Sequence, residues 1–280
     1  TAINDIWSNC YSMINRCNNA LDKIDKVSES NRKQFEGEAC FFRAYAYFTL
    51  VRLYGPVPLT QHVISNYNEL YSYNRSPKED IYALIKEDLA KATANLPQSY
   101  KEASKAGRAT SIAAKVMLAD VYMTLKDFNS AKTQLKEVID YANQNPDNLG
   151  LLDDYASIYD SENPVNKEII LAAQFNNGST QITNYLMRRC IPAVTPNNQP
   201  AYVYPDGTKS TILCSQGVSC LLMTWELYNA LRKNPQDKRY TQMVYDKLYD
   251  TSQTKSKQTD EVNVTENGEA YTPATLKYFD

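Results

Sequence analysis

The sequence predicts a mainly α-helical protein, a scaffold of tetratricopeptide-like helical hairpins joined to an irregular, loop-rich region with a little β-structure. Three observations support this prediction. An apolar helical pattern fills residues 35–53, a hairpin pattern with small alanines fills residues 113–142, and Asn, Asp, Gly and Pro replace helical periodicity beyond Pro146. We therefore expect a helical scaffold over residues 1–145 and an irregular ligand-binding region over residues 146–280.

The first expected helix covers residues 3–25 and carries an apolar stripe at helical spacing. This stripe consists of Ile3, Trp7, Cys10, Ile14, Cys17, Leu21 and Ile24. Side chains three or four residues apart share one helix face, so this face is expected to contact the rest of the scaffold. Trp7 and, later in the chain, Trp225 lie on such stripes and are predicted to be packing residues. A polar link at residues 28–31 follows this helix.

The next helix is expected to begin near Phe35 and to form the centre of the scaffold. The apolar residues around it are Phe35, Ala39, Phe41, Phe42, Tyr45, Ala46, Phe48, Leu50 and Leu53. A helix that is apolar over most of its circumference is normally buried among other helices. Residues 55–58, Gly-Pro-Val-Pro, end it abruptly. Arg43 and Arg52 lie on this otherwise apolar helix and are predicted to satisfy buried carbonyl or carboxylate groups.

Local patterns predict where two later helices begin. Ser76 is an expected N-cap, and Glu79 closes a capping box with it. The helix that follows is expected to end before Pro97, because proline cannot continue a helix. Residues 107–110, Gly-Arg-Ala-Thr, open another helix. The central helix and the helix that ends before Pro97 are expected to form a hairpin with a long loop between them.

Residues 113–142 follow the pattern of one tetratricopeptide hairpin. The small side chains of Ala119 and Ala131 allow two antiparallel helices to approach closely, and Tyr122 and Leu135 fill the seam between them. A single hairpin of this kind cannot bury its own apolar face and needs neighbouring helices. The hairpin is therefore expected to stack on the preceding helices.

The second part of the chain has few helical signals. Residues 168–175, EIILAAQF, read as a short strand, and residues 176–217 as irregular loop with short extended pieces. A helix is expected over residues 219–233 and a further strand over residues 244–249. These elements are predicted to support loops that hold a ligand.

Composition excludes several classes of function. The formal net charge of −2, the sequence pI near 5.6 and the lack of a basic run argue against a nucleic-acid partner. No apolar run approaches the length of a transmembrane helix. The motifs of nucleotide-binding proteins, zinc proteases and α/β-hydrolases are missing. We therefore predict that the chain is not an enzyme and needs no cofactor, with bound calcium left open. Cys214 and Cys220 either pair across a short loop or remain free thiols.

The titratable side chains do not form a recognisable catalytic group. His62 is the single histidine, which argues against histidine metal sites and against a catalytic triad. Glu36 and Glu38 are interpreted as charges at the start of the central helix, where negative charge is favourable. Asp153 and Asp154 lie in a loop without a recognisable partner.

Several segments, in the right order, resemble the SusD/RagB family, the nutrient-binding outer-membrane lipoproteins of Bacteroidetes. Residues 35–59 follow the family's core pattern GEA-x-FLRAY-x-YF-x-LV-x-x-YG-x-VPL, and residues 107–110 match its GRAT helix entry. The first helix matches the W-x-x-x-Y-x-x-I-x-x-x-N pattern at Trp7, Tyr11, Ile14 and Asn18. A further helix matches at Arg75, Ser76, Tyr82, Ile85, Asp88, Leu89, Ala92, Leu96 and Pro97.

This resemblance implies a function for the whole chain. Family members capture a nutrient, here expected to be an oligosaccharide, at the cell surface and deliver it to a SusC-like, TonB-dependent transporter. They are held at the outer membrane by an N-terminal lipid anchor that this chain lacks. Because members are usually much longer, the chain is expected to be truncated at both ends, as one compact SusD-like unit without its C-terminal helices. The alternatives are a RagB-type peptide-binding uptake protein and a tetratricopeptide-like scaffold that binds only protein.

Two segments have the residue types of a sugar-binding surface, in which flat aromatic rings face the sugar and polar groups bind its hydroxyls. One segment contains Asn197, Asn198, Gln199, Tyr202, Tyr204 and Asp206. The other is the loop of about fifteen residues after Pro58, long enough to indicate either function or mobility, with Tyr67, Tyr71 and Tyr73. Either segment is alternatively an ordinary surface loop, and the second is also compatible with facing the transporter or the helical core.

Overall fold

The structure is a computed structural model that divides into two compact units. These are Thr1–Gly150 with Ile169–Gln174, and Leu151–Glu168 with Phe175–Asp280. The described residues are 2–64, 66, 68, 71–100, 105–159, 165–174, 200–203, 209–213, 225–234, 236–245, 247–250, 262–263 and 274–275. Among these residues, no helix combines the length and the apolar character needed to cross a lipid bilayer.

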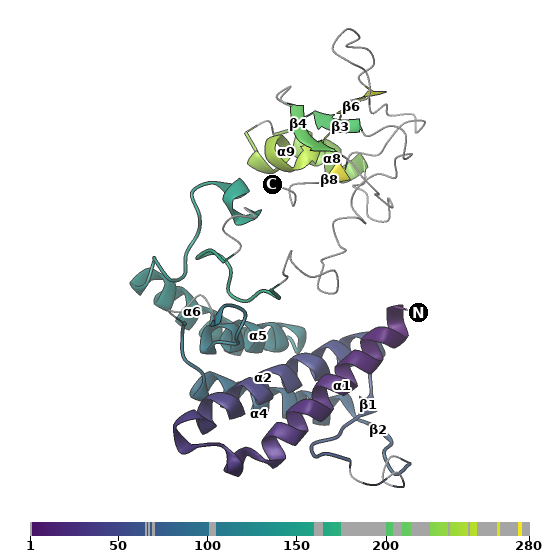
Figure 1. Cartoon of the computed structure of the whole chain (residues 1–280), viewed down its shortest axis with the longest axis vertical. Helices are drawn as coiled ribbons and strands as arrows, with labels where there is room; N and C mark the ends of the chain where they lie inside the picture. The colour runs from purple at the N-terminus through teal and green to yellow at the C-terminus, as the bar shows by residue number, and fades with distance from the viewer. Residues whose placement is uncertain are drawn as a thin grey trace. The chain divides into compact units, whose positions relative to one another are not determined.

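The first unit is a stack of long helices. They are α1 (Ala2–Asp22), α2 (Glu29–Tyr54), α4 (Lys78–Asn95), α5 (Ser111–Thr124) and α6 (Phe128–Gln144). In Figure 1, α1 packs on α2, α2 on α4, α4 on α5 and α5 on α6. The short 3-10 turn η1 (Ile24–Lys26) joins α1 to α2. This stack confirms the predicted mainly α, tetratricopeptide-like fold class.

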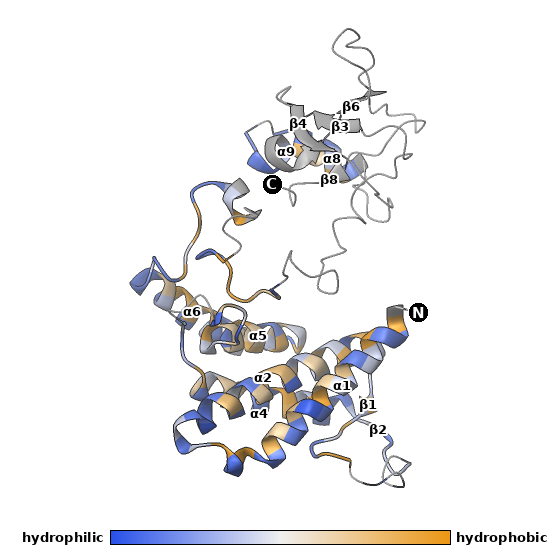
Figure 2. Ribbon diagram, in the orientation of Figure 1, coloured by the Kyte–Doolittle hydropathy of each residue, from blue (hydrophilic) through white to orange (hydrophobic). Residues whose placement is uncertain are grey.

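The core of this unit lies where its helices meet. Figure 2 shows hydrophobic residues along the inner sides of these helices and hydrophilic residues on their outer sides. The largest fully buried apolar side chains are Ile14, Tyr47, Leu50, Val57, Ile81, Ile85, Leu89 and Val121. Because burial of apolar area is the main favourable term in folding, this shared core holds the stack together.

Helix α2 begins six residues earlier than expected, at Glu29 with Ser28 as its N-cap. The predicted polar link therefore forms part of the helix, because polar residues also form helix when tertiary packing supports it. Glu36 and Glu38 consequently lie in its interior and not at its start, so the interpretation based on the helix dipole was wrong. At the other end Gly55 has a φ of 73° and its N–H donates to the Val51 carbonyl, which confirms the predicted stop.

Burial of α2 is one-sided. Tyr47 and Leu50 are fully buried in the core, whereas Phe35, Tyr45 and Leu53 are exposed. The expectation that α2 is enclosed on most sides was therefore wrong. The physical reason is that α1, α4 and α5 pack on one part of the helix surface, and apolar side chains outside those contacts remain in solvent.

The predicted stripe on α1 faces the core over most of its length. Ile14 is fully buried, and Ile3 at the start of the helix is exposed. The Trp7 ring lies 4.9 Å from the ring of Tyr11 and 5.0 Å from that of Tyr54, measured between centroids. Trp7 is thus a packing residue, as predicted.

Side-chain caps fix the last hairpin of the stack. The Thr110 hydroxyl accepts a hydrogen bond of 3.1 Å from the Ala113 N–H at the start of α5. The Asp127 carboxylate accepts one of 3.1 Å from the Ser130 N–H at the start of α6. Both satisfy backbone donors that a helix N-terminus leaves unpaired. The small residues predicted in the seam of this hairpin, Ala119 and Ala131, are both buried.

The predicted capping box before α4 does not form. The N-cap is Pro77, which has no side-chain cap, and Ser76 instead belongs to strand β2 (Arg75–Ser76). Ser76 pairs with Val57 of strand β1 (Val57–Pro58), so its backbone is extended and is used by the strand pair. The predicted hairpin of α2 and α4 is nevertheless present.

The second unit contains short helices and small antiparallel sheets. Its helical elements are η3 (Tyr155–Tyr159), α8 (Trp225–Arg232) and α9 (Lys238–Met243). Its strands are β3 (Pro200–Val203), β4 (Lys209–Leu213), β5 (Val244–Tyr245), β6 (Lys247–Asp250), β7 (Val262–Asn263) and β8 (Ala274–Thr275). One sheet has the order β4-β3-β6-β7, and β5 pairs with β8.

The predicted elements of this unit have mixed outcomes. The described part of the helix expected over 219–233 is α8. The strand expected over 244–249 is present as β5 and β6, which belong to different sheets. The strand expected over 168–175 is wrong, because the described residues 168–174 contain no strand.

The segment at residues 169–174 packs beside a turn instead of joining a sheet. Gly107 has a φ of 83°, and a Cβ added to it would lie 2.9 Å from Gln174 Cγ and 3.4 Å from the Ala172 carbonyl oxygen. The apolar residues of the segment therefore meet a helical turn and not a neighbouring strand. A short apolar run does not by itself reveal which of these environments it enters.

Candidate functional site

The residues between β1 and β2, 59–74, form a loop that we call the tyrosine loop. The two strands pair antiparallel, with Val57 opposite Ser76 and Pro58 opposite Arg75, and this brings the two ends of the loop together. The structure describes residues 59–64, 66, 68 and 71–74 of this loop. Its position is consequently set by whatever holds β1 and the residues that directly follow it.

Side chains from α1 and α2 bind the backbone of the first loop residues. Asn18 Nδ2 donates to the carbonyl oxygens of Thr60 and His62, at 3.1 Å in each case. Arg43 Nη1 donates to the Gln61 carbonyl at 3.3 Å. Three consecutive loop carbonyls are therefore held by two side chains that are themselves buried.

Two tyrosines of the scaffold also bind this backbone. The Tyr11 hydroxyl donates to the Pro58 carbonyl at 2.8 Å, and the Tyr47 hydroxyl donates to the Thr60 carbonyl at 2.8 Å. The Thr60 N–H donates to the Tyr47 hydroxyl in return, also at 2.8 Å. Burial raises the pKa of Tyr11 and of Tyr47, so both phenols remain protonated and can donate.

A buried ion pair supports these contacts. Arg43 Nε and Nη2 donate to the two Asp88 carboxylate oxygens, at 2.8 Å each, and Arg43 Nη1 donates to Asn18 Oδ1 at 2.9 Å. The two charged side chains are 7% and 0% exposed. Burial lowers the pKa of Arg43, but the hydrogen bonds and charge of Asp88 outweigh it, so the net shift of that pKa is upward. Arg43 thus binds a buried carboxylate and a loop carbonyl, as predicted.

The same prediction was wrong for Arg52. Its side chain is about half exposed, lies 3.7 Å from Asp120 and covers the Phe48 ring at 4.1 Å from the centroid. Because it lies on the solvent-facing side of α2, water solvates its charge. The pair therefore lacks the cost and the strength of a buried one.

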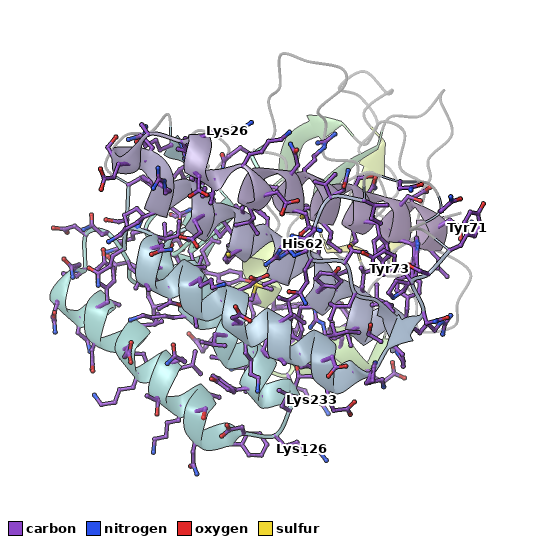
Figure 3. The ribbon with its side chains drawn as sticks, turned by 90° about the horizontal axis from the view of Figure 1, so that it is seen from below. Lys26, His62, Tyr71, Tyr73, Lys126 and Lys233 are labelled. Atoms are coloured by element: carbon purple, nitrogen blue, oxygen red, sulfur yellow. The ribbon has the colours of Figure 1, made fainter. Side chains whose placement is uncertain are left out.

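Asp22, the last residue of α1, binds the loop from a more exposed position. Asp22 Oδ2 accepts a hydrogen bond from the Val63 N–H at 2.9 Å, and Asp22 Oδ1 lies 2.9 Å from His62 Nδ1. The Val63 N–H, followed by His62, lowers the pKa of Asp22. Figure 3 labels His62 beside the loop, and its side chain is 81% exposed.

Two of the predicted binding residues lie in the described part of the loop. Tyr71 is 80% exposed and points away from the ribbon in Figure 3, and Tyr73 is half-buried. Tyr67 lies outside the described residues. An exposed tyrosine offers a flat apolar face and a polar hydroxyl to a ligand.

The other predicted binding segment is described only in part. Tyr202 belongs to β3, where it is paired with Leu248 of β6. Asn197, Asn198, Gln199, Tyr204 and Asp206 lie outside the described residues, as do Cys214 and Cys220. The role of these residues therefore stays a prediction.

The carboxylate pairs found in the sequence have structural partners. Glu38 accepts two hydrogen bonds of 2.8 Å from Arg108, and Glu36 accepts one of 2.9 Å from Asn95. Asp154 lies 3.6 Å from Lys238. In the part of the chain that the structure describes, no three metal-binding side chains are grouped to hold an ion.

The described cysteines do not offer a reactive thiolate. Cys10, Cys17 and Cys40 are buried and free. Burial raises the pKa of Cys17 to about 11 and that of Cys40 to about 12. Both thiols are therefore protonated at neutral pH and behave as small apolar side chains.

Sequence reasoning missed most of the residues that hold the loop. Tyr47, Thr60 and Asp22 received no role, although an acidic residue at a helix C-terminus is a signal because the helix dipole disfavours it. Asn18 and Asp88 were noted as matches to a family pattern, without a physical role. The structure supplies that role, since both belong to the hydrogen-bond network around Arg43.

Comparison with known proteins supports the resemblance seen in the sequence. Residues 1–123 match a SusD-like family model described as starch-binding associating with outer membrane. A SusD-like protein of Bacteroides ovatus is 33% identical over 183 residues, which cover 60% of this chain and 32% of that protein. The chain spans about a third or less of the length of the curated relatives it matches.

Solved structures agree with this family. A laminarin-binding SusD-like protein superposes with a TM-score of 0.71 at 25% identity, over 86% of this chain and 52% of that one. A crystal structure with xylogluco-oligosaccharide superposes with a TM-score of 0.56 at 27% identity, over 69% of this chain and 39% of that one. The family match, the helical stack and these relatives together establish that the chain belongs to the SusD-like family.

Proposed function

We propose that this chain binds a glycan at the cell surface, without catalysis, and delivers it to a SusC-like, TonB-dependent transporter in the outer membrane. The observation that carries the proposal is the exposed Tyr71 on a loop whose base is bound to the helical scaffold. The description of the matching family and the laminarin- and xylogluco-oligosaccharide-binding relatives support a glycan as ligand.

The physical basis of binding is a preorganised aromatic surface. The Tyr71 ring would contact the apolar face of a sugar, and neighbouring polar groups would bind its hydroxyls. A loop whose base is already ordered loses less conformational entropy when a ligand binds, so more of the contact energy remains as affinity. Tyr73 and the predicted Tyr67 would extend this surface.

We further propose a division of work along the chain. Residues 1–145 act as the scaffold, and residues 146–280 carry a second binding segment with Tyr202, Tyr204 and the polar residues around them. An N-terminal lipid anchor would hold the protein at the outer membrane. The described carboxylates and thiols argue for binding without bond chemistry, because Glu36 and Glu38 are engaged by other side chains.

Calorimetric titration with laminarin and xyloglucan oligosaccharides tests the proposal. Replacing Tyr71 by alanine is expected to weaken glycan binding about tenfold, equivalent to about 1.4 kcal/mol. Tyr45→Ala is the matched control, because Tyr45 is an exposed tyrosine on α2 outside the loop. It is expected to leave the affinity unchanged.

Three results would contradict the proposal. One is the absence of glycan binding together with binding of peptides in the same titration. Another is equal loss of affinity in Tyr71→Ala and Tyr45→Ala. The third is wild-type affinity in a variant that lacks both Tyr71 and Tyr202.

A further inference from the structure

We infer that Asp22 is a positioning residue that fixes the base of the tyrosine loop and thereby sets glycan affinity without touching the ligand. The affinity part of this inference rests on the proposed function. The part that concerns the loop rests only on contacts of Asp22 with Val63 and His62.

The location of Asp22 in its helix needs an explanation. It is the last residue of α1, and the last turn of α1 contains no basic residue. A carboxylate at a helix C-terminus is unfavourable, because that end of the helix dipole is negative. A local rule broken in this way points to a compensating interaction. The hydrogen bond from the Val63 N–H and the contact with His62 supply that compensation.

Asp22 works together with Asn18, one helical turn earlier. Residues four apart lie on the same helix face, so both side chains reach the same part of the loop. Asn18 binds the His62 carbonyl, and Asp22 binds the His62 ring and the next N–H in the chain. His62 is therefore held by its main chain and its side chain from a single face of α1.

This hold extends to the end of the loop where the tyrosines lie. The Tyr11 hydroxyl binds Pro58, and Pro58 is paired with Arg75 in the β1–β2 ladder. Tyr73 lies two residues before Arg75, so it follows directly on a strand that is paired with the fixed segment. Val63 is at the far end of that segment, and Asp22 is the side chain that binds its N–H.

The consequence for binding is entropic. With Asp22 in place the segment from Pro58 to Val63 is held on the scaffold before any ligand arrives. Without it the residues beyond His62 gain freedom, and that freedom must be lost again in the complex. Loss of the Asp22 carboxylate is therefore expected to weaken binding even though no ligand contact is removed.

The test compares Asp22→Ala with Asp127→Ala in the full chain. Asp127 is a matched control because its carboxylate also accepts a backbone N–H, at the start of α6 and outside the loop. In Asp22→Ala, hydrogen exchange at the Val63 amide is expected to accelerate about tenfold or more, because its native acceptor is gone. Affinity for laminarin oligosaccharide is expected to fall about threefold to tenfold.

Both variants are expected to lower the urea midpoint modestly, but Asp127→Ala should keep wild-type exchange at Val63 and wild-type affinity. Asp22→Asn retains an acceptor oxygen for the Val63 N–H and is expected to restore part of the affinity. A merely structural Asp22 would make affinity follow the urea midpoint in all three variants.

Each part of the inference can be overturned separately. Unchanged Val63 exchange in Asp22→Ala would overturn the hold on the loop, whatever the protein binds. Accelerated exchange with wild-type affinity would overturn the link to binding. If the wild-type protein binds no glycan, the proposed function fails, and the exchange result alone decides whether Asp22 fixes the loop.

Discussion

Arg43 is a charged side chain at the centre of an apolar helix, and its surroundings explain why it is tolerated there. Its guanidinium binds both oxygens of Asp88, the Asn18 amide oxygen and the Gln61 carbonyl. A buried ion pair gains little net stability over an apolar pair, because both charges lose their hydration. What Arg43 adds here is direction, since its fork geometry connects three chain segments in one arrangement.

Removal of one partner of this pair is predicted to be severe. Asp88→Ala leaves the Arg43 charge buried without a counter-ion, which is expected to lower the free energy of unfolding by about 3–5 kcal/mol. Urea unfolding followed by circular dichroism measures this change. Asp120→Ala removes the partner of the half-exposed Arg52 and is expected to cost less than about 1 kcal/mol. Similar losses in both variants would contradict this account of the buried pair.

At the scale of elements, the junction of α2 and α4 depends on one small residue. Gly37 lies inside α2, where glycine is normally unfavourable compared with alanine. A Cβ at this position would lie 2.9 Å from Leu96 Cγ and 3.1 Å from Asn95 Cβ. The close approach of the end of α4 to α2 therefore requires glycine.

Gly37→Ala is thus predicted to destabilise the protein despite the better helix propensity of alanine. The overpacked contact is expected to cost about 1–3 kcal/mol, measured by urea unfolding. Ala90→Gly, at an exposed position of α4, is the control and is expected to cost about 1 kcal/mol through propensity alone. Stabilisation by Gly37→Ala would show that α4 can move away without loss.

The tyrosine loop is also best understood as an element. Its ends are joined by the short β1–β2 pair, and its first residues are bound by α1 and α2. A two-stranded pair of this length is not stable by itself in water. The loop therefore owes its position to side-chain contacts with the helices, and its function depends on the fold of the first unit.

At the scale of the whole molecule, each of the two compact units contains one tryptophan. Trp7 belongs to the first unit and Trp225 to the second. In a Trp225→Phe variant, fluorescence therefore reports the first unit alone. This makes it possible to ask which part of the chain a ligand stabilises.

A glycan that binds the tyrosine loop is predicted to stabilise the first unit by mass action. At a free ligand concentration one hundred times the Kd, the free energy of unfolding is expected to rise by about 2.7 kcal/mol. Urea unfolding of the Trp225→Phe variant, with and without laminarin oligosaccharide, measures this rise. Adding Tyr71→Ala should reduce it at the same ligand concentration. A bound glycan that leaves the first unit's transition unchanged would place the binding elsewhere.

The sequence by itself determined the helices of the first unit and their order. Periodicity, the stop at Gly55 and the Gly-Arg-Ala-Thr entry at 107–110 are local signals, and local backbone preferences act wherever the chain is placed. The small Ala119 and Ala131 likewise indicated a close hairpin. These signals and the family resemblance were sufficient for the fold class.

Only the tertiary structure decided how α2 is buried, why residues 169–174 form no strand, and what holds the tyrosine loop. Asn18, Asp22 and Arg43 reach loop residues about twenty to forty positions away, and no local pattern encodes such a contact. Each contact exists because packing of the helices brings a donor and an acceptor together. The physical reason is that hydrogen bonds depend on distance in space, whereas sequence patterns report only neighbours along the chain.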